Sequence, residues 1–122
     1  MTTSKLLIID DDRDFAEGLA EFLELCGHDV DVAFTGEGGI EMAGKDAYDA
    51  ILIDIGLPGV NGVECLREIR QSDPKARCFM LTGYSADHIA KLGLEAGAAE
   101  ILTKPIDPEA LSRRFCTVKN GI

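Results

Sequence analysis

Five polar side chains stand at the ends of apolar runs in this sequence: Asp10 and Asp11 after the first run, and Asp54, Thr82 and Lys104 at the ends of three later ones. Carboxylates that crowd together disfavour joint ionisation unless a cation lies among them. Oxygen ligands point to a hard ion, and Mg²⁺ suits a site with few carboxylates, several waters and room for a phosphoryl oxygen. The residue types therefore predict an acidic magnesium site.

The other two side chains extend this chemistry to a phosphoryl group. The Lys104 ammonium can hold the acidic cluster together when metal is absent, and it can bind a phosphate when metal is present. Thr82 offers a hydroxyl donor on the opposite side of Asp54. The set resembles a phosphoryl-transfer site in which a carboxylate is the nucleophile, while Mg²⁺ and a lysine neutralise charge on the transferred group.

These side chains can act together only if the elements that carry them end at one edge of a sheet. Short apolar runs predict strands at residues 5–9, 50–53, 78–81 and 100–103, and an alternating pattern predicts another strand at 29–34. Helical spacing and capping residues predict helices at residues 15–26, 36–45, 63–71 and 89–96, and a last helix that begins at Pro108 after the capping Asp107. The helix at 36–45 should be short or loose, because each of its glycines costs roughly 1 kcal/mol relative to alanine.

The order of these elements predicts the fold class. No hairpin signal separates consecutive strands, so the alternation implies βαβ units. We expect one α/β domain over residues 1–122, with a doubly wound five-stranded parallel sheet and helices on both faces. Ligands of such sheets bind beyond the carboxyl ends of the strands, near the place where strand order reverses. The five polar side chains should therefore meet at that edge.

Composition and charge limit the possible functions. The chain has 122 residues, of which 46% are apolar and 28% charged, and this predicts a folded domain. Its formal net charge of −10 repels nucleic-acid phosphates and anionic membranes, so neither is an expected partner. Because no apolar run is long enough for a membrane span or a signal peptide, a cytoplasmic protein is expected. The four cysteines form no CxxC pair and are expected to be buried free thiols.

Four motifs, each after an apolar run, resemble those of the receiver domains of two-component response regulators, of the single-domain chemotaxis type. They are Leu-Ile-Ile-Asp-Asp-Asp at 7–12, Asp-Ile-Gly-Leu-Pro-Gly-Val-Asn-Gly at 54–62, Leu-Thr-Gly at 81–83 and Thr-Lys-Pro at 103–105. Any one of them is weak, but the four in this order are specific, and the resemblance covers residues 5–118. It implies the flavodoxin-like three-layer sandwich of that family.

The resemblance implies a magnesium site at the acidic edge. Asp10 and Asp11 would form the acidic pair, and Asp54 would be both a metal ligand and the phosphoacceptor. The backbone carbonyl of Gly56 would complete the protein ligands of Mg²⁺. Asp12 is expected to be a helix-capping or solvated acid instead.

The resemblance also implies a phosphorylation-controlled signalling switch. Asp54 would take its phosphoryl group from a sensor histidine kinase or a phosphotransfer protein, while Thr82 and Lys104 would contact the phosphoryl oxygens. The Lys104–Pro105 peptide would be cis. The surface of the fourth helix, fifth strand and fifth helix would then change for a downstream effector or output domain. Such a domain is a phosphoacceptor with slow self-dephosphorylation, not an enzyme.

Three positions depart from the usual pattern of the family. Ile101 stands where many receiver domains carry an aromatic residue, so movement of Thr82 and repacking of the fourth helix are expected to carry the signal. Gly56 offers no side chain to orient a water beside the phosphoryl group. The phosphoryl lifetime is therefore expected to depend mainly on Tyr84, two residues after Thr82.

Two other functions fit parts of the pattern. A magnesium-dependent aspartyl phosphatase of the haloacid-dehalogenase type also uses a nucleophilic aspartate, but it needs a second acid two residues later, where this chain has Gly56. A flavin-binding carrier shares the fold, but no Ser/Thr-rich phosphate loop follows the first strand. Both alternatives are therefore disfavoured.

Overall fold

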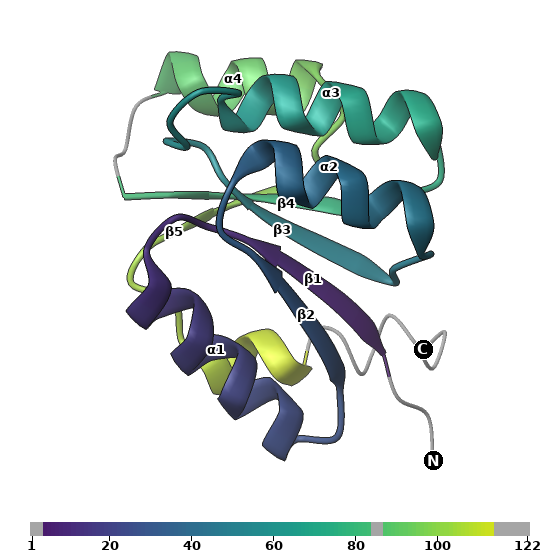
Figure 1. Cartoon of the computed structure of the whole chain (residues 1–122). Coiled ribbons are helices and arrows are strands. Elements are labelled where there is room, and N and C mark those ends of the chain that lie inside the picture. Colours follow the sequence, from purple (N-terminus) through teal and green to yellow (C-terminus); the bar gives the residue numbers. More distant parts are fainter. Residues whose placement is uncertain (1–3, 84–86, 114–122) are drawn as a thin grey trace.

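The chain folds into a five-stranded parallel sheet between two layers of helices (Figure 1). The computed structural model describes residues 4–83 and 87–113. The strands, all parallel to their neighbours, are β1 (Lys5–Ile9), β2 (Asp29–Ala33), β3 (Ala50–Asp54), β4 (Cys78–Thr82) and β5 (Glu100–Thr103). Their order in the sheet is β2-β1-β3-β4-β5, which confirms the predicted doubly wound arrangement.

Helices cover both faces of this sheet. One face carries α1 (Arg13–Leu25) and helical residues 108–113, and the other carries α2 (Gly36–Lys45), α3 (Gly62–Ser72) and α4 (Asp87–Glu95) (Figure 1). The central strands carry apolar side chains on both faces of the sheet, because helices pack against each face. Among the described residues, no helix is long and apolar enough to cross a bilayer.

Two hydrophobic clusters hold the layers together, one on each side of the sheet. Alternate residues of β1 divide between them: Leu6 and Ile8 face the α1 side, whereas Leu7 and Ile9 face the α2 and α3 side. All four side chains have no exposed surface. This buried strand ends at Asp10, so the packing of its leucines and isoleucines fixes the position of the first acid.

Helix α2 has the predicted bounds, Gly36–Lys45. It is continuous over all ten residues, so its glycines do not shorten it as expected. A Cβ atom at Gly39 would lie 2.6 Å from Ile9 Cγ1, and one at Gly36 would lie 2.7 Å from the Val60 carbonyl oxygen. These glycines let α2 lie against β1 and the loop before α3, and the resulting packing offsets their low helix propensity.

The cysteines are only partly buried. Cys65 and Cys78 are buried free thiols, and burial is the main cause that raises the pKa of each to about 12. They are therefore protonated core side chains. Cys26 is exposed at the C-cap of α1, so the expectation of burial is wrong there. Cys116 lies outside the described residues.

Candidate functional site

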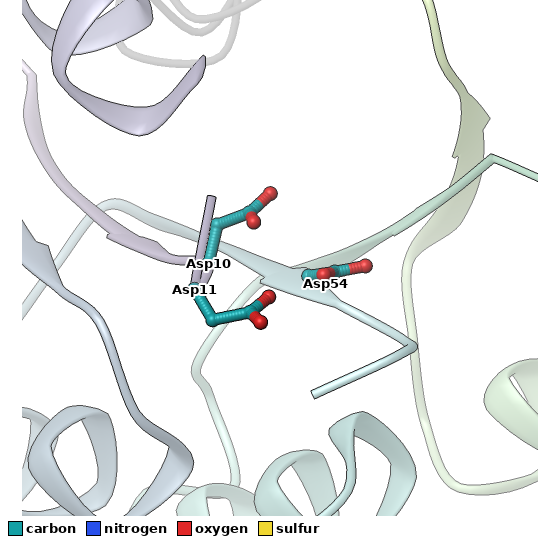
Figure 2. A group of neighbouring side chains, drawn as sticks. All are labelled: Asp10, Asp11 and Asp54. Carbon is teal, nitrogen blue, oxygen red and sulfur yellow. The ribbon is translucent and has the colours of Figure 1, made fainter. Parts of the chain in front are cut away.

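The register of the central strands brings the acidic residues together. Ile9 pairs with Ile53 between β1 and β3, so Asp10 and Asp54 are the next residues along two neighbouring strands. The strand order reverses between these two strands, where ligands of such sheets bind. Figure 2 shows Asp10, Asp11 and Asp54 at this edge, and one carboxylate oxygen of each lies within 4.8 Å of the others.

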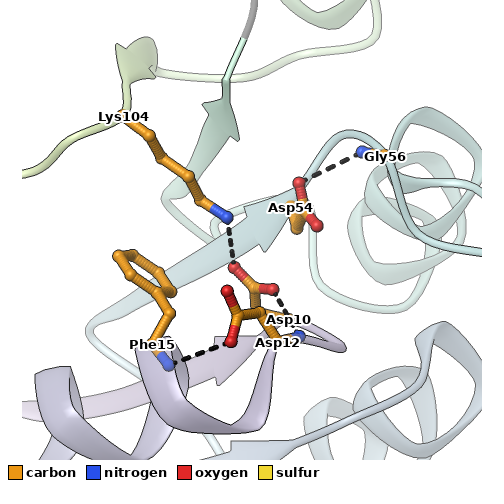
Figure 3. Close-up of polar contacts among 6 residues, drawn as sticks. All are labelled: Asp10, Asp12, Phe15, Asp54, Gly56 and Lys104. Carbon is orange, nitrogen blue, oxygen red and sulfur yellow. Dashed lines mark hydrogen bonds and ion pairs between the residues drawn. The ribbon is translucent and has the colours of Figure 1, made fainter.

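Asp10 is the buried member of the cluster, with no exposed surface. Its Oδ1 accepts a hydrogen bond from the Asp12 N–H at 2.9 Å, and its Oδ2 accepts one from Lys104 Nζ at 2.9 Å (Figure 3). A carboxylate removed from water needs such partners. Asp10 is thus an anchored anion, whereas Asp11 is exposed to solvent.

Asp54 is half-buried at the end of β3, beside the other two acids. Its Oδ1 accepts a hydrogen bond from the Gly56 N–H at 3.2 Å (Figure 3). Burial raises the pKa of Asp54 above its ordinary value; the Gly56 N–H opposes this, and the negative charges of Asp10 and Asp11 add to it. The carboxylate therefore lies where a nearby cation would favour its ionised form.

Thr82 and Lys104 reach the same edge from the last two strands. Leu81 pairs with Asp54 between β3 and β4, so Thr82 follows at the end of the neighbouring strand, where it is 5% exposed. The Lys104 N–H donates to the Thr82 carbonyl oxygen at 2.7 Å, which ties the end of β5 to β4. The Lys104–Pro105 peptide is cis, as the resemblance implied.

Gly62 brings the start of α3 against the backbone of Asp54. A Cβ atom at this position would collide with the Asp54 carbonyl oxygen and would lie 2.6 Å from Ile55 Cα. Asn61 caps the helix, because its Oδ1 accepts a hydrogen bond from the Glu64 N–H at 3.0 Å. Close packing against the Asp54 backbone therefore explains why the motif that begins at Asp54 ends with a glycine at position 62.

The donor set fits a hard divalent cation. Asp10, Asp11 and Asp54 offer carboxylate oxygens, and among the residues that the structure describes the ammonium paired with these acids is that of Lys104. An oxygen-only set with excess negative charge is the kind of site that Mg²⁺ occupies. The structure thus brings together the three acids and Lys104, and it places Thr82 at the end of the neighbouring strand.

Phe15 also lies at this edge, although the sequence indicated it only as the first residue of the helix predicted at 15–26. Lys104 Nζ lies 4.4 Å from the centre of its ring (Figure 3). The available signal was its place in the first turn of a helix that is capped by Asp12, directly after the acidic pair. Nothing in the spacing indicated that a lysine from the far end of the chain would lie over this ring.

Ile101 is half-buried and packs beneath α4. A Cβ atom at Gly93 would lie 3.1 Å from Ile101 Cδ1 and 3.3 Å from Met80 Cγ, so α4 approaches the sheet closely at this point. The prediction at Tyr84 falls outside the described residues and stays a prediction.

Proteins of known family are similar to this chain in sequence. The family model described as the response regulator receiver domain matches residues 6–115. A response regulator receiver protein of Anaeromyxobacter sp. (strain Fw109-5) is 37% identical over 102 residues, which are 84% of this chain and 43% of that protein. This chain spans about half the length of the curated relatives it matches.

Solved structures share the fold. A CheY-like receiver domain protein from Methanospirillum hungatei JF-1 has a TM-score of 0.88 at 26% identity, over 99% of this chain and 100% of that one. A response regulator protein from Burkholderia pseudomallei has a TM-score of 0.85 at 28% identity, over 97% of this chain and 70% of that one. That structure contains a phosphorylated aspartic acid, a calcium ion and citrate. With its family match, its parallel sheet and its acidic edge, this chain belongs to the response regulator receiver domain family.

Proposed function

We propose that this receiver domain is a phosphorylation-controlled switch whose phosphoacceptor is Asp54. One observation carries the proposal: a carboxylate oxygen of Asp54 lies within 4.8 Å of oxygens of Asp10 and Asp11, while the Lys104 ammonium binds Asp10. Receiver domains are phosphoacceptor signalling domains, and a group of acids with one lysine suits that chemistry. We extend the proposal to residues 1–122 as one domain.

The metal ligands in this proposal are Asp10, Asp11, Asp54 and the backbone carbonyl of Gly56. Mg²⁺ bound there supplies positive charge beside the transferred phosphoryl group. The chain contributes a pre-positioned anion, because the Asp12 N–H and the Lys104 ammonium hold the Asp10 carboxylate in place. Asp11 is exposed, which leaves its carboxylate free of a burial cost before a cation arrives.

The transfer step is a displacement at phosphorus. An Asp54 oxygen attacks the phosphorus of a phosphohistidine on a sensor histidine kinase or a phosphotransfer protein. The new O–P bond forms as the P–N bond breaks, and the bonding electron pair stays with the imidazole nitrogen. Lys104 and Thr82 contact the phosphoryl oxygens and stabilise their charge. Water then cleaves the acyl phosphate slowly, so the domain is a switch and does not turn over many substrate molecules.

The output surface in this proposal comprises α4, β5 and the helix that follows β5. Leu92 and Leu94 support it, because they are exposed on α4 at 44% and 52%. Ile101 has no ring to rotate, so repacking of α4, which approaches Ile101 at Gly93, carries the signal together with movement of Thr82 to an effector or output domain.

The proposal is tested with phosphoramidate, a small donor that also carries a P–N bond. In the presence of Mg²⁺ the intact mass of the denatured wild-type protein should rise by one phosphoryl group. The Asp54→Asn variant and a wild-type sample with excess chelator should stay unmodified. A wild-type protein that gains no mass, or an Asp54→Asn variant that gains as much, contradicts the proposal.

A further inference from the structure

Lys104 has two partners of different kinds at the acidic edge. Its Nζ lies 2.9 Å from Asp10 Oδ2 and 4.4 Å from the centre of the Phe15 ring (Figure 3). The Lys104 side chain is 23% exposed, and the Asp10 side chain has no exposed surface. The ammonium is therefore held by a buried carboxylate and by the face of an aromatic ring.

The turn that anchors Asp10 also fixes the position of Phe15. The Asp12 N–H donates to Asp10 Oδ1, and Asp12 Oδ1 accepts a hydrogen bond from the Phe15 N–H at 3.2 Å. Phe15 is half-buried and packs against the core cluster beneath α1. Its ring thus lies on the first turn of a capped helix, which is a rigid support for a partner of Lys104.

We infer that Phe15 is a positioning residue that keeps the Lys104 ammonium at the phosphoryl site, an inference that rests on the proposed function. The carboxylate of Asp10 is also a ligand in the proposed metal site, so its attraction for Lys104 weakens when a divalent cation shares its charge. The attraction of the ring comes from its quadrupole and does not depend on the charge of Asp10. Phe15 therefore holds the ammonium in the state in which phosphoryl transfer takes place.

The first test compares three variants by the rate at which phosphoramidate and Mg²⁺ phosphorylate them. Phe15→Leu keeps an apolar side chain but removes the ring, and it should slow the reaction about three-fold. Phe15→Tyr keeps the ring and should react at nearly the wild-type rate. Phe22→Leu is the matched control, because Phe22 packs against the same core cluster from the same helix, and it should also react at nearly the wild-type rate.

A double-mutant cycle separates positioning of Lys104 from general packing. In a Lys104→Met background, the Phe15→Leu change should have no further effect on the rate, because the group that the ring positions is gone. A slowing of about three-fold that persists in this background contradicts the inference.

A second readout needs neither metal nor phosphoryl donor. The Lys104 Cε protons should show an upfield NMR shift from the Phe15 ring, and this shift should disappear in Phe15→Leu but not in Phe22→Leu. In the wild type it should persist when Mg²⁺ is added. A Lys104 shift that is the same in Phe15→Leu as in the wild type overturns the inference.

The two proposals fail in different ways. A wild-type protein that takes no phosphoryl group contradicts the proposed function and this inference with it. A wild type that is phosphorylated, beside a Phe15→Leu variant that is phosphorylated equally fast, contradicts the inference alone.

Discussion

The two ends of the parallel sheet differ in how their polar groups are paired. At the amino end, the Lys5 N–H donates to Asp49 Oδ2 at 2.7 Å, and the Lys5 ammonium lies 3.6 Å from Asp46. Beside them, the Tyr48 hydroxyl donates to Asp31 Oδ2 at 2.7 Å. Asp49, Asp46 and Asp31 each have a donor or an ammonium of the chain as a partner, as in a structural network.

At the carboxyl end, the described part of the chain places three carboxylates beside the Lys104 ammonium. Lys104 binds Asp10, while Asp54 and Asp11 add negative charge beside it. The pKa of Asp54 is raised by burial above all and further by the charges of Asp10 and Asp11. The comparison teaches that the acids at the amino end have partners within the chain, whereas the proposed function assigns a ligand of positive charge to the acids at the carboxyl end.

Removing Lys104 should produce the largest difference between the two ends. Lys104→Met leaves the buried Asp10 carboxylate without its charged partner, so the free energy of unfolding in metal-free buffer should fall by about 2 kcal/mol. The phosphorylation rate should fall about ten-fold or more, because the lysine no longer stabilises the phosphoryl oxygens. Urea unfolding with and without Mg²⁺ measures the first effect, and Mg²⁺ should recover part of the loss.

The matched control for this variant is Lys45→Met. Lys45 pairs with Glu41 at 3.0 Å on the surface of α2, where both side chains are mostly exposed. Such a pair contributes roughly 0.5 kcal/mol or less. Equal losses of stability in the two variants would contradict the special role of the pair between Lys104 and Asp10.

Substitution of Gly62 should disturb the carboxyl end alone. A Cβ atom there collides with the backbone of Asp54, so Gly62→Ala should cost about 2 kcal/mol of unfolding free energy and should slow phosphorylation. Gly18→Ala is the control, since beyond the adjacent backbone of α1 and its two chain neighbours no atom lies within 4 Å of a Cβ built at this exposed position. That change should stabilise the protein by about 0.5 kcal/mol. Thermal unfolding of both variants is the measurement, and a Gly62→Ala protein as stable as the wild type speaks against the close contact.

The Tyr48 hydroxyl offers the converse test at the amino end. Tyr48→Phe removes the hydrogen bond to Asp31 and should cost about 1 kcal/mol of unfolding free energy. The phosphorylation rate should stay at the wild-type value, because the network lies at the other end of the strands. A changed phosphorylation rate with an unchanged free energy of unfolding would contradict a purely structural role for the Tyr48 network.

The smallest expected effect is a pH dependence of stability that comes from Asp54. Because its folded pKa is raised, the folded state binds this proton more readily than the unfolded chain does, so the contribution of Asp54 to stability falls as pH rises from the ordinary carboxyl pKa through the folded pKa. Asp54→Asn lacks this fall. In metal-free buffer, the free energy of unfolding of Asp54→Asn should therefore increase relative to that of the wild type as pH rises across that interval. Mg²⁺ should reduce this difference between the two proteins at neutral pH. Chemical unfolding across the acidic range measures both proteins, and parallel curves would contradict the cause given for the shift.

The acidic edge was predictable from the sequence because local signals specify it. Four of the five predicted strands appear as continuous apolar runs, each of these four runs ends on a polar residue, and parallel strands carry those residues to one edge. The register of Ile9 with Ile53 then places Asp10 beside Asp54. The capping role of Asp12 was predictable for the same reason, since a cap depends on residues within one turn.

The features that the sequence did not indicate are tertiary contacts. The glycines of α2 lowered its predicted helicity, but Gly39 is needed for close packing against Ile9, which no local pattern reveals. The contact of Phe15 with Lys104 joins the first helix to the end of the last strand, so its two halves carry no shared local signal. Cys26 is apolar by type yet exposed, because it lies at the end of α1, beyond the packed part of the helix.

The central claim is that the Asp54 carboxylate forms the bond to phosphorus, and the most direct measurement locates that bond. After phosphorylation with phosphoramidate and Mg²⁺, borohydride reduces an aspartyl phosphate to homoserine, and peptide mass spectrometry identifies the residue that has changed. The account predicts homoserine at position 54, with the other acids of the edge, Asp10 and Asp11, unaltered. Homoserine at another position, or a phosphorylated protein with an intact Asp54, would contradict it.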